Sequence, residues 1–149
     1  MILLAFDFGT KNIGIAIGEY LTKTSRTLTC IPANKNTYWI EIQKLILEWK
    51  PIKIIIGLPL NIRGKKQKTT IKVKKFAVQL LKKFNIPIYL HDERFTTKEA
   101  KSILFNKYGQ KKFNSHTINS TSALIILRSW LYENMHINLK KNVKNNKKY

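Results

Sequence analysis

The chain has 149 residues, a length typical of one domain with a single hydrophobic core. Its 28 Lys and Arg against 8 Asp and Glu give a net charge of +20, which excludes an acidic disordered segment and favours polyanionic partners such as nucleic acids. Only four of these cations are Arg, while Lys, Ile and Asn are abundant. Two explanations of the high positive charge therefore stay open. One is a nucleic-acid partner, and the other is A/T-rich coding, which favours Lys, Ile and Asn codons in any protein.

Cys30 is the single cysteine, which excludes a disulfide framework and a zinc site built from cysteines. The first apolar run, Ile2–Phe6, is too short for a membrane or secretory segment, and no basic region precedes it. We therefore expect a soluble protein of a reducing compartment, the cytoplasm, with no membrane partner.

The first third of the chain predicts three strands. Ile2–Phe6 is continuously apolar and ends at Asp7, as in a strand buried on both faces. Residues 9–12 predict a hairpin turn, because Gly and Asn accept positive φ. Ile13–Ile17 is the expected return strand, and Thr24–Ile31 is expected at a sheet edge.

Helices and strands alternate in the rest of the chain. A stripe of apolar residues predicts a helix over residues 39–49 that closes before Pro51. Two short apolar runs predict buried strands at 53–57 and 86–90, and three further helices are expected over 73–84, 96–109 and 119–133.

This order predicts an α/β fold with a five-stranded mixed sheet flanked by helices. Residues 1–137 form the expected domain, and residues 138–149, mostly Lys and Asn, are expected to be a disordered basic tail. Sites in such sheets form beyond the carboxyl ends of the central strands.

Carboxylates follow the first and the last of the predicted buried strands. Asp7 ends the first strand, and Asp92 and Glu93 come shortly after the last one. Oxygen ligands from separate strands suit Mg²⁺, which can activate water for phosphodiester hydrolysis. The alternatives are a turn with Asp7 paired to Lys11, an ion pair of Glu93 with Arg94 or a lysine, and a loop or capping role for Asp92.

Three motifs resemble those of the YqgF (RuvX) family, described as Holliday junction resolvases and as nucleases that mature the 5′ end of pre-16S ribosomal RNA. They are residues 5–11 (AFDFGTK) with 13–16 (IGIA), residues 56–61 (IGLPLN) with Gly64, and residues 92–97 (DERFTT) with Glu99-Ala100. The resemblance covers about residues 1–135 and implies a ribonuclease H-like fold.

The resemblance also implies an acidic triad that binds Mg²⁺ or Mn²⁺ and acts in catalysis. In this chain its positions hold Asp7, Glu93 and Asn119, where the family has an Asp at the third position. An Asn carbonyl can ligate Mg²⁺ without neutralising it, so weaker metal binding is expected. The alternative is that Asn119 is only a helix N-cap.

Nucleic-acid contacts are expected near these carboxylates. The candidates are Thr10, Lys11, Asn61, Arg63, Lys65, Lys66 and Arg94. The alternative for Thr10 and Lys11 is a solvated turn without a ligand, and for the 58–64 loop it is a tight turn. Arg94 could instead orient Glu93 or form a salt bridge. His91 is expected at a strand end rather than as a ligand, and the three tryptophans are expected in the core.

The function expected from these residues and the resemblance is a metal-dependent nuclease acting on pre-ribosomal RNA, as a monomer or weak dimer, in contact with ribosomal particles. Two alternatives stay open. One is a catalytically weakened RNA-binding or ribosome-assembly factor, and the other is a Holliday junction resolvase acting on DNA. An actin-like ATPase, which shares the Asp-x-Gly-Thr hairpin, would need a second domain that 149 residues cannot supply.

Overall fold

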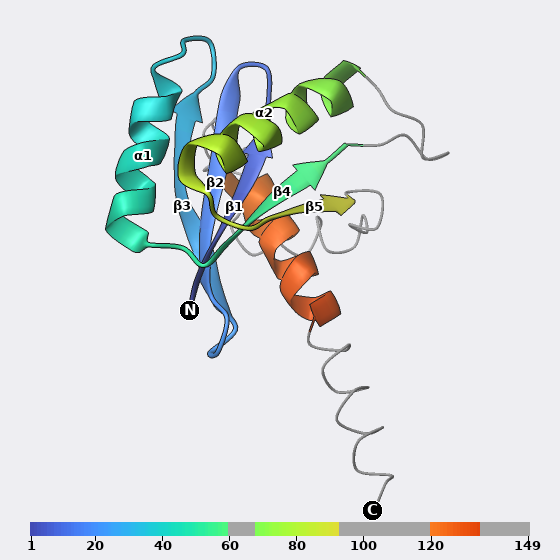
Figure 1. Ribbon diagram of the computed structural model, residues 1–149. Helices are drawn as coiled ribbons and strands as arrows, with labels where there is room; N and C mark the ends of the chain where they lie inside the picture. The colour runs from blue at the N-terminus through green and yellow to red at the C-terminus, as the bar shows by residue number, and fades with distance from the viewer. Residues whose placement is uncertain (60–67, 93–119, 135–149) are drawn as a thin grey trace, which may run out of the picture.

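The computed structural model describes residues 1–59, 68–92 and 120–134, and it shows one five-stranded sheet in the order β3-β2-β1-β4-β5 (Figure 1). The elements are β1 (Ile2–Phe8), β2 (Asn12–Glu19), β3 (Thr24–Pro32), α1 (Tyr38–Trp49), β4 (Lys53–Leu58), α2 (Lys68–Phe84), β5 (Ile88–Asp92) and a helix over residues 120–134. The predicted α/β fold with a mixed sheet is confirmed.

The central strand is β1, and it pairs in both directions. It runs antiparallel to β2 through a hairpin and parallel to β4, which in turn is parallel to β5. Its four buried residues, 3–6, are all apolar, which suits an interior strand covered on both faces. The carboxyl ends of β1, β4 and β5 therefore meet at one edge of the sheet.

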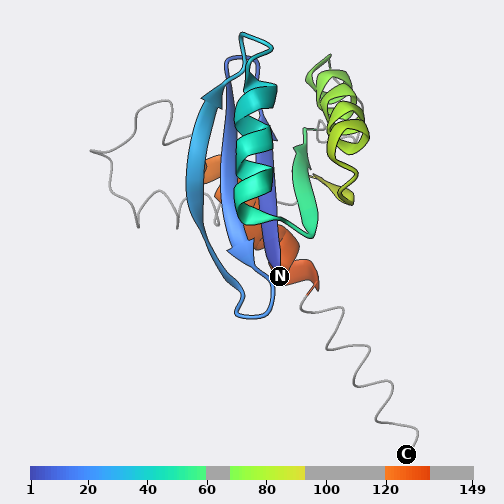
Figure 2. The same cartoon turned by 60° about the vertical axis from the view of Figure 1, so that its left-hand side comes forward.

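Helices cover both faces of the sheet (Figures 1 and 2). On one face α1 and α2 enclose a core that includes Leu4, Phe6 and Phe76. On the other face the helix over 120–134 packs its apolar side chains on Leu3 and Ala5. Successive residues of β1 thus alternate between two cores, as the two-residue period of a strand requires.

Tryptophans contribute to both cores, as predicted. Trp130 is 3% exposed in the core under the helix over 120–134, while Trp39 and Trp49 are partly buried against the other core. The predicted helix end before Pro51 is also confirmed. Lys50 adopts a left-handed conformation with φ of 47°, and its N–H donates to the Ile46 carbonyl.

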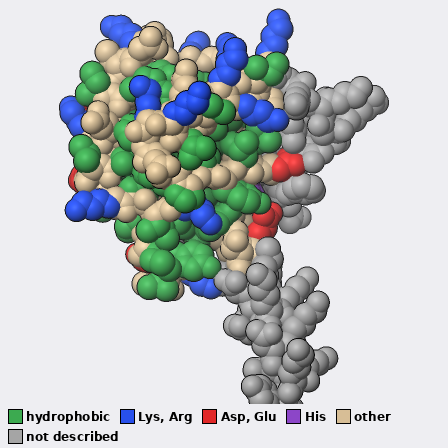
Figure 3. Space-filling view, in the orientation of Figure 1, with side chains coloured by type: hydrophobic (Ala, Val, Ile, Leu, Met, Phe, Trp, Pro, Cys, Tyr) green, Lys and Arg blue, Asp and Glu red, His purple; other side chains and the backbone are tan. Residues whose placement is uncertain are grey.

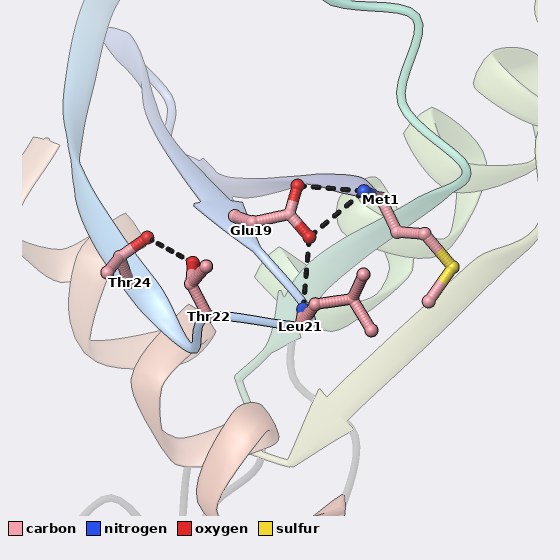
Figure 4. A network of polar contacts seen from close by, with 5 residues as sticks. All are labelled: Met1, Glu19, Leu21, Thr22 and Thr24. Atoms are coloured by element: carbon pink, nitrogen blue, oxygen red, sulfur yellow. Dashed lines mark hydrogen bonds and ion pairs between the residues drawn. The ribbon is translucent and has the colours of Figure 1, made fainter.

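Polar contacts join the amino end of β1 to the end of β2, at the sheet edge opposite to Asp7 (Figure 4). The Met1 ammonium group lies 2.7 and 2.9 Å from the two carboxylate oxygens of Glu19, which lowers the pKa of that carboxyl. The Leu21 N–H also donates to Glu19, and the Thr22 and Thr24 hydroxyls are 2.8 Å apart.

The predicted bounds of several strands were wrong, including those of β1 and β5. β1 continues two residues past the predicted end, to Phe8, so Asp7 lies within the strand. β5 starts at Ile88 instead of residue 86 and ends at Asp92, which therefore forms part of the strand rather than a loop or a cap. Pairing of Leu58 with Asp92 explains the extension, because the parallel ladder with β4 continues to that position.

Several predictions lie outside the described residues. They include the helix over 96–109 and the basic tail over 138–149. The predicted last helix is confirmed over 120–134. None of the helices within 1–59, 68–92 and 120–134 is long and apolar enough to span a membrane.

Candidate active site

Asp7 lies near the carboxyl end of the central strand and is half-buried. It follows Ala5 by two residues, so its side chain shares the face covered by the helix over 120–134. Its cross-strand partner on that face is Gly14, which has no side chain to fill the adjacent space. A carboxylate placed between a central strand and a helix is well positioned to receive a cation.

The end of β5 lies at the same sheet edge as Asp7. Phe6 pairs with Ile56, Ile56 pairs with Leu90, and the ladder ends with Leu58 paired to Asp92. Two strand spacings, or about 10 Å, separate β1 from β5. Glu93 follows Asp92 directly in the chain, so the covalent backbone leads to Glu93 from this edge.

The β1–β2 hairpin forms the rim beside Asp7. Its connecting residues are 9–11, and the Gly9 N–H donates to the Asn12 carbonyl at 2.9 Å. A Cβ at Gly9 would lie 2.7 Å from that carbonyl oxygen, which explains the need for glycine. Thr10 and Lys11 are exposed there, within reach of a ligand bound near Asp7.

The helix over 120–134 begins near the same level of the sheet. The Ser120 hydroxyl donates to the Thr29 carbonyl at 3.2 Å. Thr29 pairs with Ile15, and Ile15 pairs with Phe6, the residue before Asp7. Asn119 precedes Ser120 in the chain, so the third predicted ligand adjoins a segment anchored at the level of Asp7.

A buried histidine joins β5 to the same helix, and sequence reasoning missed this link. His91 is 2% exposed, its Nε2 lies 2.9 Å from the Ser129 hydroxyl, and its Nδ1 lies 3.8 Å from Glu133 Oε2. Burial lowers the pKa of His91, while the carboxylates of Glu133 and Asp92 oppose that shift. The available signal was the four-residue spacing of Ser129 and Glu133, which places both on one side of the helix.

The predicted site residues divide into two groups. Asp7, Thr10 and Lys11 come together at the carboxyl edge of the sheet. The others lie outside the described residues, and they are Asn61, Arg63, Lys65, Lys66, Glu93, Arg94 and Asn119. Within the described ranges no three His, Cys, Asp or Glu side chains form a cluster that could hold a metal ion.

Positive charge is not confined to this edge. Lys and Arg side chains are spread over the face formed by α1 and α2 (Figure 3). α2 carries six lysines, and it covers the sheet face opposite to the one that carries Asp7. Part of the net charge therefore lies away from the candidate site.

Comparisons with known proteins identify the family of this chain. A family model described as RuvX, Holliday junction resolvase, matches residues 1–133. The chain belongs to the RuvX family. A relative from Wigglesworthia glossinidia brevipalpis, named "Putative pre-16S rRNA nuclease", is 53% identical over 87% of this chain and 91% of its own length. A relative of the same name from Buchnera aphidicola subsp. Schizaphis graminum is 49% identical over 91% of this chain and all of its own length.

Solved structures show the fold. The Thermus thermophilus RuvC structure superposes with a TM-score of 0.60 at 15% identity, over 91% of this chain and 97% of that one. RuvC from the same organism in complex with a Holliday junction substrate gives a TM-score of 0.59 at 14% identity, over 91% and 96%. The ribonuclease H-like fold expected from the RuvX resemblance is thereby confirmed, and the chain is a member of a family of nucleases.

Proposed function

We propose that this protein is a divalent-metal-dependent nuclease that cleaves precursor 16S ribosomal RNA at its 5′ end. The observation that carries the proposal is the convergence of β1 and β5 at one sheet edge, with Asp7 on β1 and Glu93 directly after β5. The choice of RNA rests on the relatives at 53% and 49% identity that bear that name.

Asp7, Glu93 and Asn119 would hold Mg²⁺ or Mn²⁺. All three offer oxygen ligands, the donor type that these ions prefer, and the half-buried Asp7 at a strand end fits such a role. When bound, the ion supplies charge that stabilises the phosphate in the transition state and favours the hydroxide form of water.

The chain's own residues would then orient the substrate. Lys11 and Thr10 at the hairpin would contact the backbone phosphate beside Asp7. Arg94 and the segment with Asn61, Arg63, Lys65 and Lys66 would hold the flanking nucleotides. Water attacks the phosphorus, the bond to the leaving oxygen breaks, and a proton returns to that oxygen.

The substitution Asn119→Asp tests how far the neutral third ligand limits metal binding at the site. The substitution adds one negative charge, so the Mn²⁺ concentration for half-maximal cleavage should fall by about 10- to 100-fold, the range seen when groups around a metal change. Cleavage of an RNA fragment that spans the 5′ junction of 16S rRNA measures this effect. A parallel reaction with a four-way DNA junction tests the resolvase alternative that the family description favours.

Each outcome of that assay has a meaning. Cleavage by the wild type at the RNA junction supports the proposal, and cleavage of only the DNA junction would replace it by a resolvase. If the wild type is inactive and Asn119→Asp restores cleavage, the natural chain is a weakened enzyme that acts by binding RNA. In either case RNA binding should weaken steeply with added salt.

A further inference from the structure

A partly exposed aromatic ring lies on the edge strand, on the sheet face that carries Asp7. Tyr89 is 45% exposed and stands in β5, which is the last strand in the sheet order. It pairs with Ile55, a member of the core under the helix over 120–134. Ala5 pairs with Ile55 in turn, so Ala5, Ile55 and Tyr89 form a row across that face.

This row places Tyr89 close to the candidate site. Asp7 lies two residues beyond Ala5, and β4 separates the two strands. Ideal strand spacings put the Cα atoms of Asp7 and Tyr89 roughly 12 Å apart. Ala5 and Ile55 are fully buried under the helix over 120–134, so a nucleotide chain with a phosphate at Asp7 would pass around the edge strand β5 to place a base at Tyr89.

Neighbouring rings hold the Tyr89 ring in place. Its centroid lies 6.1 Å from that of Trp130 in an edge-to-face arrangement, and 6.5 Å from that of His91. Trp130 and His91 are 3% and 2% exposed, so both supports are rigid core groups. A ring that is ordered before binding loses little conformational entropy when a ligand stacks on it.

A cation accompanies this ring cluster. Lys53 Nζ lies 5.1 Å from the centroid of the Trp130 ring, and Lys53 is two residues before Ile55 on the same face of β4. An aromatic platform combined with a positive charge is the arrangement that proteins use to bind unpaired nucleotides, through base stacking and phosphate attraction.

We propose that Tyr89 stacks on an unpaired base of the substrate a few nucleotides from the cleaved phosphate, with Lys53 near the backbone of that base. The site thereby selects nucleic acid that is single-stranded on the β5 side. This inference rests on the nuclease function proposed above. Stacking needs the ring and not the hydroxyl, so Phe should replace Tyr89 and an aliphatic β-branched residue should not.

Equilibrium binding tests the subsite separately from catalysis. The probe is a single-stranded RNA of about 12 nucleotides that contains 2-aminopurine, titrated in EDTA so that no cleavage occurs. Tyr89→Ile should raise Kd by roughly 5- to 150-fold, and Tyr89→Phe should change it less than about twofold. A blunt duplex of the same sequence should bind equally to the wild type and to both variants.

Tyr132→Leu is the matched control. Tyr132 is 64% exposed and lies two residues, or about 200° around the helix, from Trp130, so it projects away from the sheet. The Tyr132→Leu variant should bind the RNA probe with the same Kd as the wild type. Circular dichroism spectra and melting temperatures of all variants establish that the fold is kept, which is expected because Ile also favours strands.

The outcomes distinguish this inference from the proposed function. Equal Kd values for Tyr89→Ile and the wild type would overturn the stacking subsite, even if the wild type cleaves RNA. A Kd that depends on the ring, in a protein that cleaves no nucleic acid with Mg²⁺ or Mn²⁺, would support the subsite and reject the nuclease. Equal losses in Tyr89→Ile and Tyr132→Leu would also overturn it.

Discussion

Asp7→Asn should lower the rate of RNA cleavage by about three orders of magnitude, because loss of metal-borne charge costs several kcal/mol in the transition state. The substitution keeps the size of the side chain and removes its negative charge. This chain is especially sensitive to that loss, since the third predicted ligand is already the neutral Asn119. Only Glu93 would then carry charge among the three.

The matched control for this change is Glu48→Gln. It makes the same chemical alteration on an exposed position of α1, which covers the face opposite to Asp7. We expect wild-type cleavage from it under initial-rate conditions with Mg²⁺. Cleavage by a folded Asp7→Asn variant at more than a tenth of the wild-type rate would remove Asp7 from the metal site.

Phe76→Ala should lower the free energy of unfolding by about 3–5 kcal/mol, the cost typical of a large aromatic residue lost from a core. Phe76 is 2% exposed and stacks on Phe8 at 4.4 Å and on Trp39 at 5.4 Å. Its ring also contacts those of Phe6 and Tyr38. The cavity would lie under the end of β1 that carries Asp7.

Urea denaturation followed by tryptophan fluorescence measures that loss, and the melting temperature should fall by roughly 10 °C. Val78→Ala on the same helix serves as the control, because Val78 is 51% exposed and should change stability by less than about 0.5 kcal/mol. Similar effects of the two substitutions would show that α2 does not pack through Phe76 as described.

The central part of the fold could be predicted because its signals are local. The apolar run before Asp7 and the helix over 73–84 each reflect the period of one element, and the turn at residues 9–12 reflects its residue types; all three are confirmed. The ribonuclease H-like topology was predicted from the resemblance of three motifs to one family, because the periodicity of a single element does not show how the elements are arranged.

The end of β5 could not be predicted from local pattern. The apolar run begins at residue 86, but Pro87 has no N–H, and the strand begins after it. His91 was expected at the strand end, and Asp92 in a loop or a cap. His91 is buried against Ser129, which lies 38 residues away in the sequence and leaves no signal beside His91.

The candidate site was also predictable only in part, because some of its contacts join residues that are distant in the sequence. The positions of carboxylates at strand ends suggested that Asp7 and Glu93 share a sheet edge, and the parallel ladder brings the ends of β1 and β5 there. The assignment of Asn119 came from family resemblance alone. Tyr89 was not singled out, because its role depends on Trp130 and His91, which only the folded chain brings together.

Mn²⁺ binding to the wild type, Asp7→Asn, Glu93→Gln and the double variant, followed by electron paramagnetic resonance, tests the central claim most directly. If both carboxylates hold one ion, each single change should weaken binding at least about tenfold, and the double change should add little beyond either one. Undiminished Mn²⁺ affinity in both single variants, or losses that simply add in the double variant, would contradict a shared metal site.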